Sequence, residues 1–269
     1  MLTRMRIGHF ELEILTTGEG PPILLIHGIH PVHPAAPFID RLAKTGKLIA
    51  PSHPGFGTSP LPPDFDAMYD LINLYHAILD SLTSTDVTVI GFSFGGWIAA
   101  ELAVMRPKNL RRLILVDSVG IKIGGREERD ITHFFNTDPL ELQQHGWHDP
   151  SRRPSGTYGV GWQSMIDDSM SDQDMISMAR NWDSLCLYAW RPHMFNPNLK
   201  QWLHRIAVPA LLIWGESDRV VTPRYGRAFA DLIPNAGFIE IANAGHHPEL
   251  EQPDAFVATV SRFMAETGQ

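Results

Sequence analysis

The sequence predicts an α/β fold with a mostly parallel central sheet, flanking helices and an inserted α-helical cap. Strands that are covered on both faces are almost continuously hydrophobic. Four short runs have this character: "PPILLIHG", "DVTVIGFS", "LRRLILVDS" and "VPALLIWGES". Helical patterns separate the strand runs, and this alternation is typical of α/β folds. The alternation stops after "LVDSVG" and resumes only at Val208, which indicates an insertion.

The other elements follow in chain order. "HFELEIL" alternates apolar and polar residues, as an antiparallel edge strand with one solvated face does. "GKLIAPSHPGFG" and, with fewer apolar residues, "GFIEIAN" repeat the buried-strand form. We expect helices at residues 37–45, 66–83, 95–105, 223–232 and 253–266. Asp66 is the expected N-cap of the second helix, whose apolar face carries Tyr69, Ile72, Leu74, Ile78 and Leu79.

The insertion runs from residue 121 to about residue 205 without a pattern of buried strands. A structureless loop of this length inside a compact domain is unusual, so a helical cap is the better interpretation. We therefore expect a core domain of residues 1–120 and 206–269 and a mobile cap of residues 121–205. The cap is expected to set substrate choice without supplying a catalytic residue. Its large apolar surface includes Trp147, Trp162, Trp182 and Trp190.

Composition argues against several classes of protein. The 269 residues are 43% hydrophobic, enough for a sizeable core, and the net charge of -8 without a basic run argues against a nucleic-acid partner. A single cysteine excludes an internal disulfide. No apolar stretch approaches the roughly 20 residues of a membrane span, and the start lacks a signal-peptide pattern. We expect a soluble, cytoplasmic protein that acts on a small molecule as a monomer or a homodimer.

The turn "GFSFGG" follows the apolar run "DVTVI" and precedes a helical pattern. A phosphate-binding P-loop needs Lys and then Ser or Thr, whereas Trp97 and Ile98 follow Gly96 here. The glycine spacing does not fit a dinucleotide-binding turn either. The turn fits G-x-S-x-G between a strand and a helix, which raises a serine above the sheet edge with a helix N-terminus behind it. Ser93 is therefore the predicted nucleophile.

A serine nucleophile needs a general base and an acid that orients the base. After such an elbow, the acid and then the histidine follow along the chain. Asp218 follows the strand in "LLIWGESDRVVTP", and His246 follows the last strand in "IEIANAGHHPELEQP". Asp117, at the end of an earlier strand, is the alternative acid, although Asp218 has the better local motif. His247, next to His246, is the alternative base.

Five segments together resemble the α/β-hydrolase superfamily, in its serine hydrolase and esterase type with a helical cap: "LLIHG", "HPGFGTS", "GFSFGG", "WGESDRVV" and "AGHHPELEQP". The resemblance covers nearly the whole chain and implies the α/β-hydrolase fold. It favours His246 as the base, because the catalytic histidine of the superfamily directly follows the glycine. The oxyanion hole should use the backbone N–H of Phe94, the residue after the nucleophile, and the resemblance adds that of Ile29.

The expected substrate pocket combines aromatic residues of the cap with two histidines: Trp162, Trp182, Tyr188, Phe195, His30 and His247. His27, His30 and His33 recur at every third position of "HGIHPVHP", which raises the question of a metal site. Pro31 and Pro34 prevent a regular helix there, so the three imidazoles need not converge. We expect neither a metal nor a cofactor.

The expected activity is that of a carboxylesterase-like hydrolase, which cleaves an ester or related acyl compound with an apolar portion through an acyl-enzyme. The alternative is carbon–carbon bond hydrolysis of ring-cleavage (meta-cleavage) products, whose enzymes share the fold, triad and cap. Those relatives typically continue His-Gly with a Ser-Gly-Pro-Gly-like loop, whereas this chain has "HGIHPVHP". Haloalkane dehalogenases and epoxide hydrolases use an aspartate nucleophile, so Ser93 argues against both. Cofactor-free oxygenases, perhydrolases and low-turnover ligand receptors share the scaffold, and the intact triad argues against the receptors.

Overall fold

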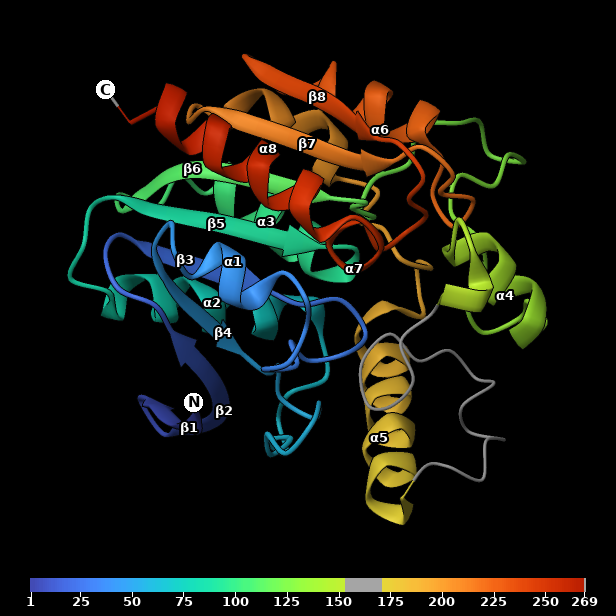
Figure 1. Ribbon diagram of the computed structural model, residues 1–269. Coiled ribbons are helices and arrows are strands. Elements are labelled where there is room, and N and C mark those ends of the chain that lie inside the picture. Colours follow the sequence, from blue (N-terminus) through green and yellow to red (C-terminus); the bar gives the residue numbers. More distant parts are fainter. Residues whose placement is uncertain (153–170, 269) are drawn as a thin grey trace.

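Within residues 1–152 and 171–268, which the computed structural model describes, the sheet has eight strands in the order β1-β2-β4-β3-β5-β6-β7-β8 (Figure 1). β1 pairs with β2 and β2 with β4 in antiparallel orientation, and the other neighbouring pairs are parallel. The predicted mostly parallel α/β sheet is confirmed. The strands are β1 (Leu2–Ile7), β2 (Phe10–Thr17), β3 (Pro22–Ile26), β4 (Lys47–Pro51), β5 (Val87–Phe92), β6 (Leu110–Val116), β7 (Ala210–Gly215) and β8 (Ala236–Ile241).

Parallel pairing brings the carboxyl ends of the central strands to one edge of the sheet. Ile26 at the end of β3 pairs with Gly91 of β5. Val116 at the end of β6 pairs with Phe92 on one side and with Ile213 of β7 on the other. The turns after these strands therefore begin side by side, at the edge where open α/β sheets bind their ligands.

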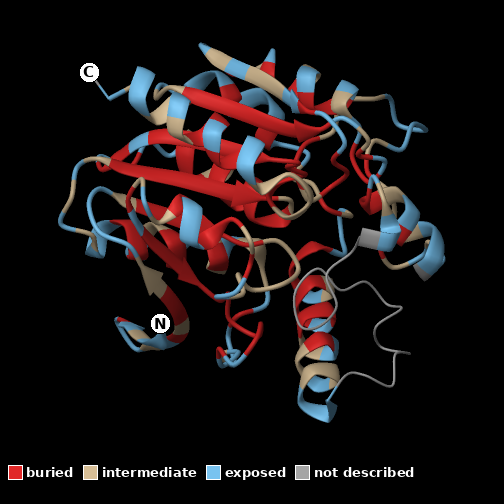
Figure 2. Ribbon diagram, in the orientation of Figure 1, coloured by how far each residue is buried: buried red, intermediate tan, exposed pale blue. Residues whose placement is uncertain are grey.

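Helices cover both faces of the sheet, which explains the continuous apolar strands. The helices are α1 (Ile39–Leu42), α2 (Met68–Ser81), α3 (Phe94–Val104), α6 (Pro223–Ala230), α7 (Pro248–Glu251) and α8 (Pro253–Glu266). In β3, Leu24 and Ile26 join the core that includes α2, α3 and α6, whereas Ile23 and Leu25 join the core that includes α1 and α8. Figure 1 shows α1 and α8 in front of the sheet and α2 and α3 behind it, and Figure 2 shows the buried strands between them.

The predicted N-cap of α2 is wrong by one residue. Ala67, rather than Asp66, is the N-cap, and the carboxylate of Asp70 accepts hydrogen bonds from the N–H groups of both residues, at 3.1 and 3.2 Å respectively. Asp70 therefore satisfies N–H groups that the helix leaves open at this end. Tyr69 is exposed because the buried face of α2 carries Leu71, Leu74, Tyr75, Ile78 and Leu79 instead.

The described part of the chain between β6 and β7 contains helices and no strand. They are α4 (Pro139–Gly146), η1 (Pro150–Arg152), α5 (Asp172–Ala189) and η3 (Leu199–Arg205). α4 and α5 lie beyond the carboxyl ends of the strands (Figure 1). η3 packs against α3, and its Leu199 and Leu203 join the core on that face of the sheet. None of the helices in the described residues has the length and apolar character that crossing a bilayer requires.

Candidate active site

Ser93 lies in a strained turn between β5 and α3. Its backbone has φ 49° and ψ -112°, a conformation that residues other than glycine rarely adopt. The backbone N–H of Ser93 donates to the carbonyl oxygen of Val116 in β6 at 2.8 Å. A Cβ on Gly95 would lie 2.1 Å from the carbonyl oxygen of Ile26, so only glycine allows α3 to approach β3 this closely. The glycines of "GFSFGG" thus hold the serine above the sheet edge.

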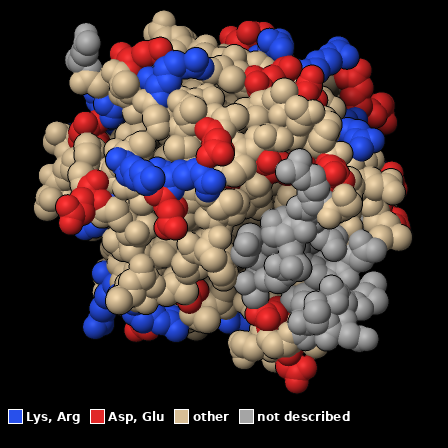
Figure 3. All heavy atoms as spheres, viewed as in Figure 1, with Lys and Arg blue, Asp and Glu red and all other residues tan. Residues whose placement is uncertain are grey.

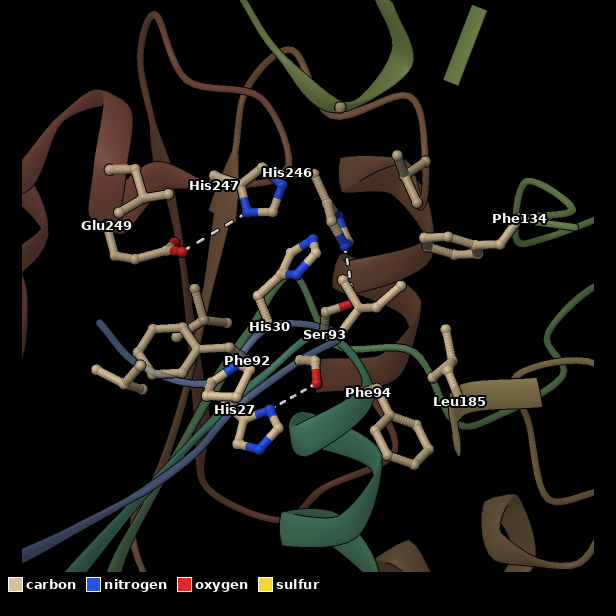
Figure 4. A pocket seen from close by; sticks show the side chains of 18 of the residues that line it. His27, His30, Phe92, Ser93, Phe94, Phe134, Leu185, His246, His247 and Glu249 are labelled. Carbon is tan, nitrogen blue, oxygen red and sulfur yellow. Dashed lines mark hydrogen bonds and ion pairs between the residues drawn. The ribbon is translucent and has the colours of Figure 1, made fainter. Parts of the chain in front are cut away.

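Three side chains from three loops form a continuous hydrogen-bonded relay. The hydroxyl of Ser93 donates to Nε2 of His246 at 2.8 Å (Figure 4). Nδ1–H of His246 donates to Oδ2 of Asp218 at 2.8 Å. Asp218 and His246 are only 2% and 5% exposed. The other carboxylate oxygen of Asp218, Oδ1, accepts from the backbone N–H groups of Val220 and Val221 at 2.8 and 3.1 Å. The acid is therefore fixed independently of the histidine that it orients.

Close backbone packing positions the loops that carry Asp218 and His246. A Cβ on Gly215, the last residue of β7, would lie 1.8 Å from the carbonyl oxygen of Gly245. The N–H of His246 donates to the carbonyl oxygen of Gly146, the last residue of α4, at 2.8 Å. The loop with the histidine is thereby attached both to the sheet and to the inserted helices.

Asp117, the alternative acid, lies beside the relay but has a different partner. Its Oδ1 accepts from the N–H of Gly215 at 2.9 Å, and its side chain is fully buried. Burial first, and then the adjacent charge of Asp218, raise the pKa of Asp117 well above its usual range. Both effects favour the protonated form of Asp117, and the histidine is bonded to Asp218 rather than to Asp117.

Asp117→Asn is expected to retain most activity, because an asparagine has nearly the shape of a neutral aspartic acid and its Oδ1 can still accept from Gly215. Above the ordinary aspartate pKa of about 4, the unfolded wild type releases this proton while the folded state keeps it, which destabilises the wild type as pH rises. The free energy of unfolding of the variant, relative to wild type, should therefore increase with pH above about 4. Urea unfolding of both proteins from pH 5 to 8 measures this difference in the free energy of unfolding. A variant that has lost ester hydrolysis would instead identify Asp117 as the catalytic acid.

Among the described residues, Asp117, Asp218 and His246 offer a group of possible metal ligands, with ligand atoms within 4.8 Å of one another. The histidine nitrogen on this side already donates to Asp218, and Asp117 bonds to Gly215. This arrangement suits a proton relay better than a cation.

Two further buried side chains, those of His27 and His53, hold the loop after β3; the sequence had singled out His27 but not His53. Nδ1–H of His27 donates to the carbonyl oxygen of Gly28 at 2.8 Å, and its Nε2 accepts from the N–H of His53 at 2.9 Å. Nε2–H of His53 donates to the carbonyl oxygen of His27 at 2.9 Å, and the hydroxyl of Tyr75 donates to its Nδ1 at 2.6 Å. Burial lowers the pKa of His53 to about 3, so the ring stays neutral. These bonds fix Gly28 and Ile29 beside Ser93.

A cavity of about 130 Å³ opens beside Ser93. Of the predicted pocket residues, His30, Trp182 and His247 line it, as do Ile29 and Phe94 of the expected oxyanion hole. Further lining residues that the sequence did not indicate are Phe38, Phe92, Phe134, Trp147, Leu185 and Glu249. The only available signal was the three-residue spacing of Trp182 and Leu185, which places them on one face of α5.

Two predicted pocket residues do not line this cavity, and one lies outside the described residues. The Tyr188 ring stacks on Phe56, with ring centroids 6.5 Å apart, and its hydroxyl donates to the carbonyl oxygen of Pro54 at 3.3 Å. Tyr188 therefore attaches α5 to the loop after β4. Phe195 forms a backbone bridge with Gly120 and packs against the core that includes α3. Trp162 is the residue outside the described part of the chain.

The described lining of the cavity contains no lysine or arginine. Its ionisable side chains are histidines and Glu249, and most of its other side chains are apolar. On the molecular face in Figure 3, Lys and Arg side chains are interspersed with Asp and Glu. Because the described lining has no lysine or arginine, an anionic ligand in the cavity would find no strongly basic side chain there.

The sheet order, the serine elbow after β5 and the helices inserted between β6 and β7 define an α/β-hydrolase fold. This chain belongs to the Alpha/beta hydrolase family, whose pattern matches residues 23–259. It is thus a member of a hydrolase family, as the sequence motifs predicted.

Similar proteins include hydrolases with different reactions. A 2-hydroxymuconate semialdehyde hydrolase of Pseudomonas putida is 30% identical over 270 residues, which cover 93% of this chain and 89% of that protein. Lipase 1 of Psychrobacter immobilis is 25% identical over 249 residues, 87% of this chain and 74% of that protein. The solved structure of a meta-cleavage product hydrolase from Pseudomonas fluorescens IP01 has a TM-score of 0.74 at 21% identity, over 98% of this chain and 97% of that chain. This last likeness shows the fold alone.

Proposed function

We propose that this protein is a serine hydrolase that cleaves a carboxylic ester, or a related acyl compound, with an apolar portion. The observation that carries the proposal is the relay from Ser93 through His246 to Asp218, which opens onto a largely apolar cavity. A hydroxyl beside a buried, carboxylate-oriented imidazole is the arrangement that activates serine for acyl transfer.

In the proposed mechanism, Ser93 Oγ attacks the carbonyl carbon while Nε2 of His246 accepts the hydroxyl proton. Asp218 stabilises the resulting imidazolium through the bond to Nδ1–H. The tetrahedral intermediate then expels the alcohol, which receives the proton from His246, and the acyl-enzyme remains. Water next attacks the acyl-enzyme as His246 accepts its proton. Release of the carboxylic acid returns that proton to Ser93.

The oxyanion of each tetrahedral intermediate is proposed to bind the backbone N–H groups of Ile29 and Phe94. Both residues line the cavity beside Ser93, and Phe94 is the first residue of α3, where a helical N–H has no acceptor within the helix. The network of His27, His53 and Tyr75 supports the loop that carries Ile29. A preorganised donor of this kind contributes about 3 kcal/mol to transition-state stabilisation.

Carbon–carbon bond hydrolysis is the second candidate, favoured by the 30% identical 2-hydroxymuconate semialdehyde hydrolase. Ring-cleavage products of the dienoate type carry a carboxylate, and its transfer into a buried cavity is costly without a basic partner. The described lining supplies no lysine or arginine, which supports a neutral ester as the substrate.

A panel of p-nitrophenyl esters of increasing acyl length, assayed beside a dienoate ring-cleavage product, separates the two candidates. Ester hydrolysis with the higher kcat/KM is expected. A dienoate that is cleaved more efficiently than the best ester would establish the second candidate. Covalent labelling by a fluorophosphonate probe tests the receptor alternative, since a pure receptor need not react.

We also propose that residues 121–205 form the cap on a core of residues 1–120 and 206–269. Phe134, Trp182 and Leu185 support this division, because they extend from the insertion to the cavity, while the relay residues all lie on loops of the sheet. The contact of η3 with α3 gives the C-terminal end of the cap a fixed attachment.

Substitutions of cap residues at the cavity should change acyl-length preference rather than abolish catalysis. For Trp182→Ala and Leu185→Ala, the ratio of kcat/KM between a short and a long acyl ester should change by a factor that corresponds to about 1–3 kcal/mol of transition-state free energy per site. Tyr188→Phe is the matched control on α5, because this ring packs on Phe56 away from the cavity. Equal losses on both esters in the two alanine variants would contradict a role of the cap in selecting substrate.

A further inference from the structure

Glu251, the last residue of α7, connects the loop that carries His246 to the inserted helices. Its Oε2 accepts from the backbone N–H of Gly245, directly before His246, at 2.5 Å. Its Oε1 accepts from the N–H groups of His148 and Asp149, just after α4, at 3.0 and 3.3 Å. Both α4 and α7 lie beyond the carboxyl ends of the strands (Figure 1). One carboxylate thus receives N–H donors from two segments that are far apart in the chain.

The bond to Gly245 matters most, because this residue is buried. A buried N–H group without an acceptor is costly, and a carboxylate is a stronger acceptor than a neutral group. The next N–H of the chain, that of His246, donates to the carbonyl oxygen of Gly146 at 2.8 Å. Two consecutive N–H groups of the loop therefore have acceptors outside it, one from α7 and one from α4. Together these two bonds fix the backbone of His246.

The position of this backbone decides whether the imidazole can reach both of its partners. Nδ1 of His246 lies 2.8 Å from Oδ2 of Asp218, and Nε2 lies 2.8 Å from Oγ of Ser93. A displacement of the loop would lengthen one of these distances or both, and a misplacement of about 1 Å can lower a rate about 100-fold. Glu251 itself does not line the cavity, so its effect on the reaction would pass through His246.

The segment at the end of α4 also bonds to the loop that carries Asp218. The N–H of Arg219 donates to the carbonyl oxygen of His145 at 3.0 Å, and Oγ of Ser217 lies 2.8 Å from Nδ1 of His148. This segment therefore contacts both the acid loop and the histidine loop. Removal of the carboxylate would loosen only the contact with the histidine loop, so the base would shift relative to its acid.

We propose that Glu251 is a positioning residue for His246. Its carboxylate holds the histidine loop against the end of α4, at the place where the imidazole bonds to both Ser93 and Asp218. The proposal rests on the proposed ester hydrolysis. It adds to the relay a residue that contacts neither the imidazole nor the cavity.

The test measures kcat for a p-nitrophenyl ester per reactive serine. Complete labelling with a fluorophosphonate probe counts the molecules with a reactive Ser93, so unfolded protein does not enter this kcat. Glu251→Ala removes the acceptor of all three N–H groups and should lower kcat by about 10- to 100-fold. KM should change little, because His246 serves both acylation and deacylation. Glu251→Gln keeps one acceptor oxygen, but its NH₂ group must face at least one N–H donor, so its kcat should be intermediate.

Glu216→Ala is the matched control, because Oε2 of this exposed side chain accepts from the N–H of Asn243 in the same loop at 3.3 Å. Its kcat per labelled serine should equal that of wild type. A purely structural role of Glu251 would lower thermal stability and the number of labelled serines but leave kcat per labelled serine unchanged.

An unchanged kcat per labelled serine in Glu251→Ala, or an equal loss in Glu216→Ala, would overturn the positioning role alone. If Glu251→Ala does not fold, Glu251→Gln takes its place, and a kcat equal to that of wild type would overturn the proposal in the same way. No hydrolysis of any ester by wild type, together with no labelling of Ser93, would instead overturn the proposed function.

Discussion

Ser93→Ala is expected to lower ester hydrolysis by a factor of about 10⁴ or more without unfolding the protein. Ser93 is the only described lining residue with a hydroxyl or thiol, so no neighbouring nucleophile can replace it. Alanine keeps the Cβ that the chain already accommodates at φ 49°, and the backbone bond from residue 93 to Val116 remains. The loss should therefore appear in kcat rather than in stability.

The measurement combines kcat/KM for the best ester with fluorophosphonate labelling and thermal unfolding. Ser261→Ala in α8 serves as the control, since its hydroxyl donates to the carbonyl oxygen of Val257 in the same helix. Labelling should disappear in Ser93→Ala and persist in the control. Retention of most activity in a clean preparation of Ser93→Ala would refute the nucleophile assignment.

The sheet could be predicted from the sequence because burial on both faces imposes a local pattern. β5 and β7 are buried at every position, and such strands are almost continuously apolar. The elbow was equally predictable, since contacts such as that between Gly95 and Ile26 require glycine at fixed positions around Ser93. These features depend on residues close together in the chain or on a packing rule that holds for the whole fold.

The finer features of the site depend on partners distant in the chain. The sequence offered both Asp117 and Asp218 after strands and favoured Asp218 on its local motif, but the partner of each carboxyl group becomes visible only in the structure, where Asp218 bonds to His246 and Asp117 to Gly215. Tyr188 was expected in the pocket because it is aromatic, but its orientation follows from the loop at Phe56 and Pro54. The donor to His53, Tyr75, comes from α2 and belongs to no motif. Such contacts emerge only when the elements are packed.

Asp218→Asn is expected to lower kcat/KM by about 10⁴ while the fold is retained. The N–H groups of Val220 and Val221 both donate to Oδ1, so the oxygen of the asparagine amide should take that position. Its NH₂ group would then face Nδ1 of His246, where the wild type has Oδ2 as an acceptor. The imidazole can satisfy this donor only as the tautomer with its proton on Nε2, which points at Ser93 and cannot accept the serine proton.

The comparison with Asp117→Asn makes this prediction specific, because the two carboxyl groups are neighbours but only Asp218 contacts the histidine. Measured on the same ester at pH 7, Asp218→Asn should lose nearly all activity and Asp117→Asn little. The double variant should be no less active than Asp218→Asn, since the carboxyl group of Asp117 bonds to Gly215 and not to the histidine. If Asp218→Asn instead keeps substantial activity that the second substitution removes, Asp117 becomes ionised when its neighbour is neutral and serves as a second acid. If Asp218→Asn and the double variant both keep activity within tenfold of wild type, the relay does not depend on this carboxylate.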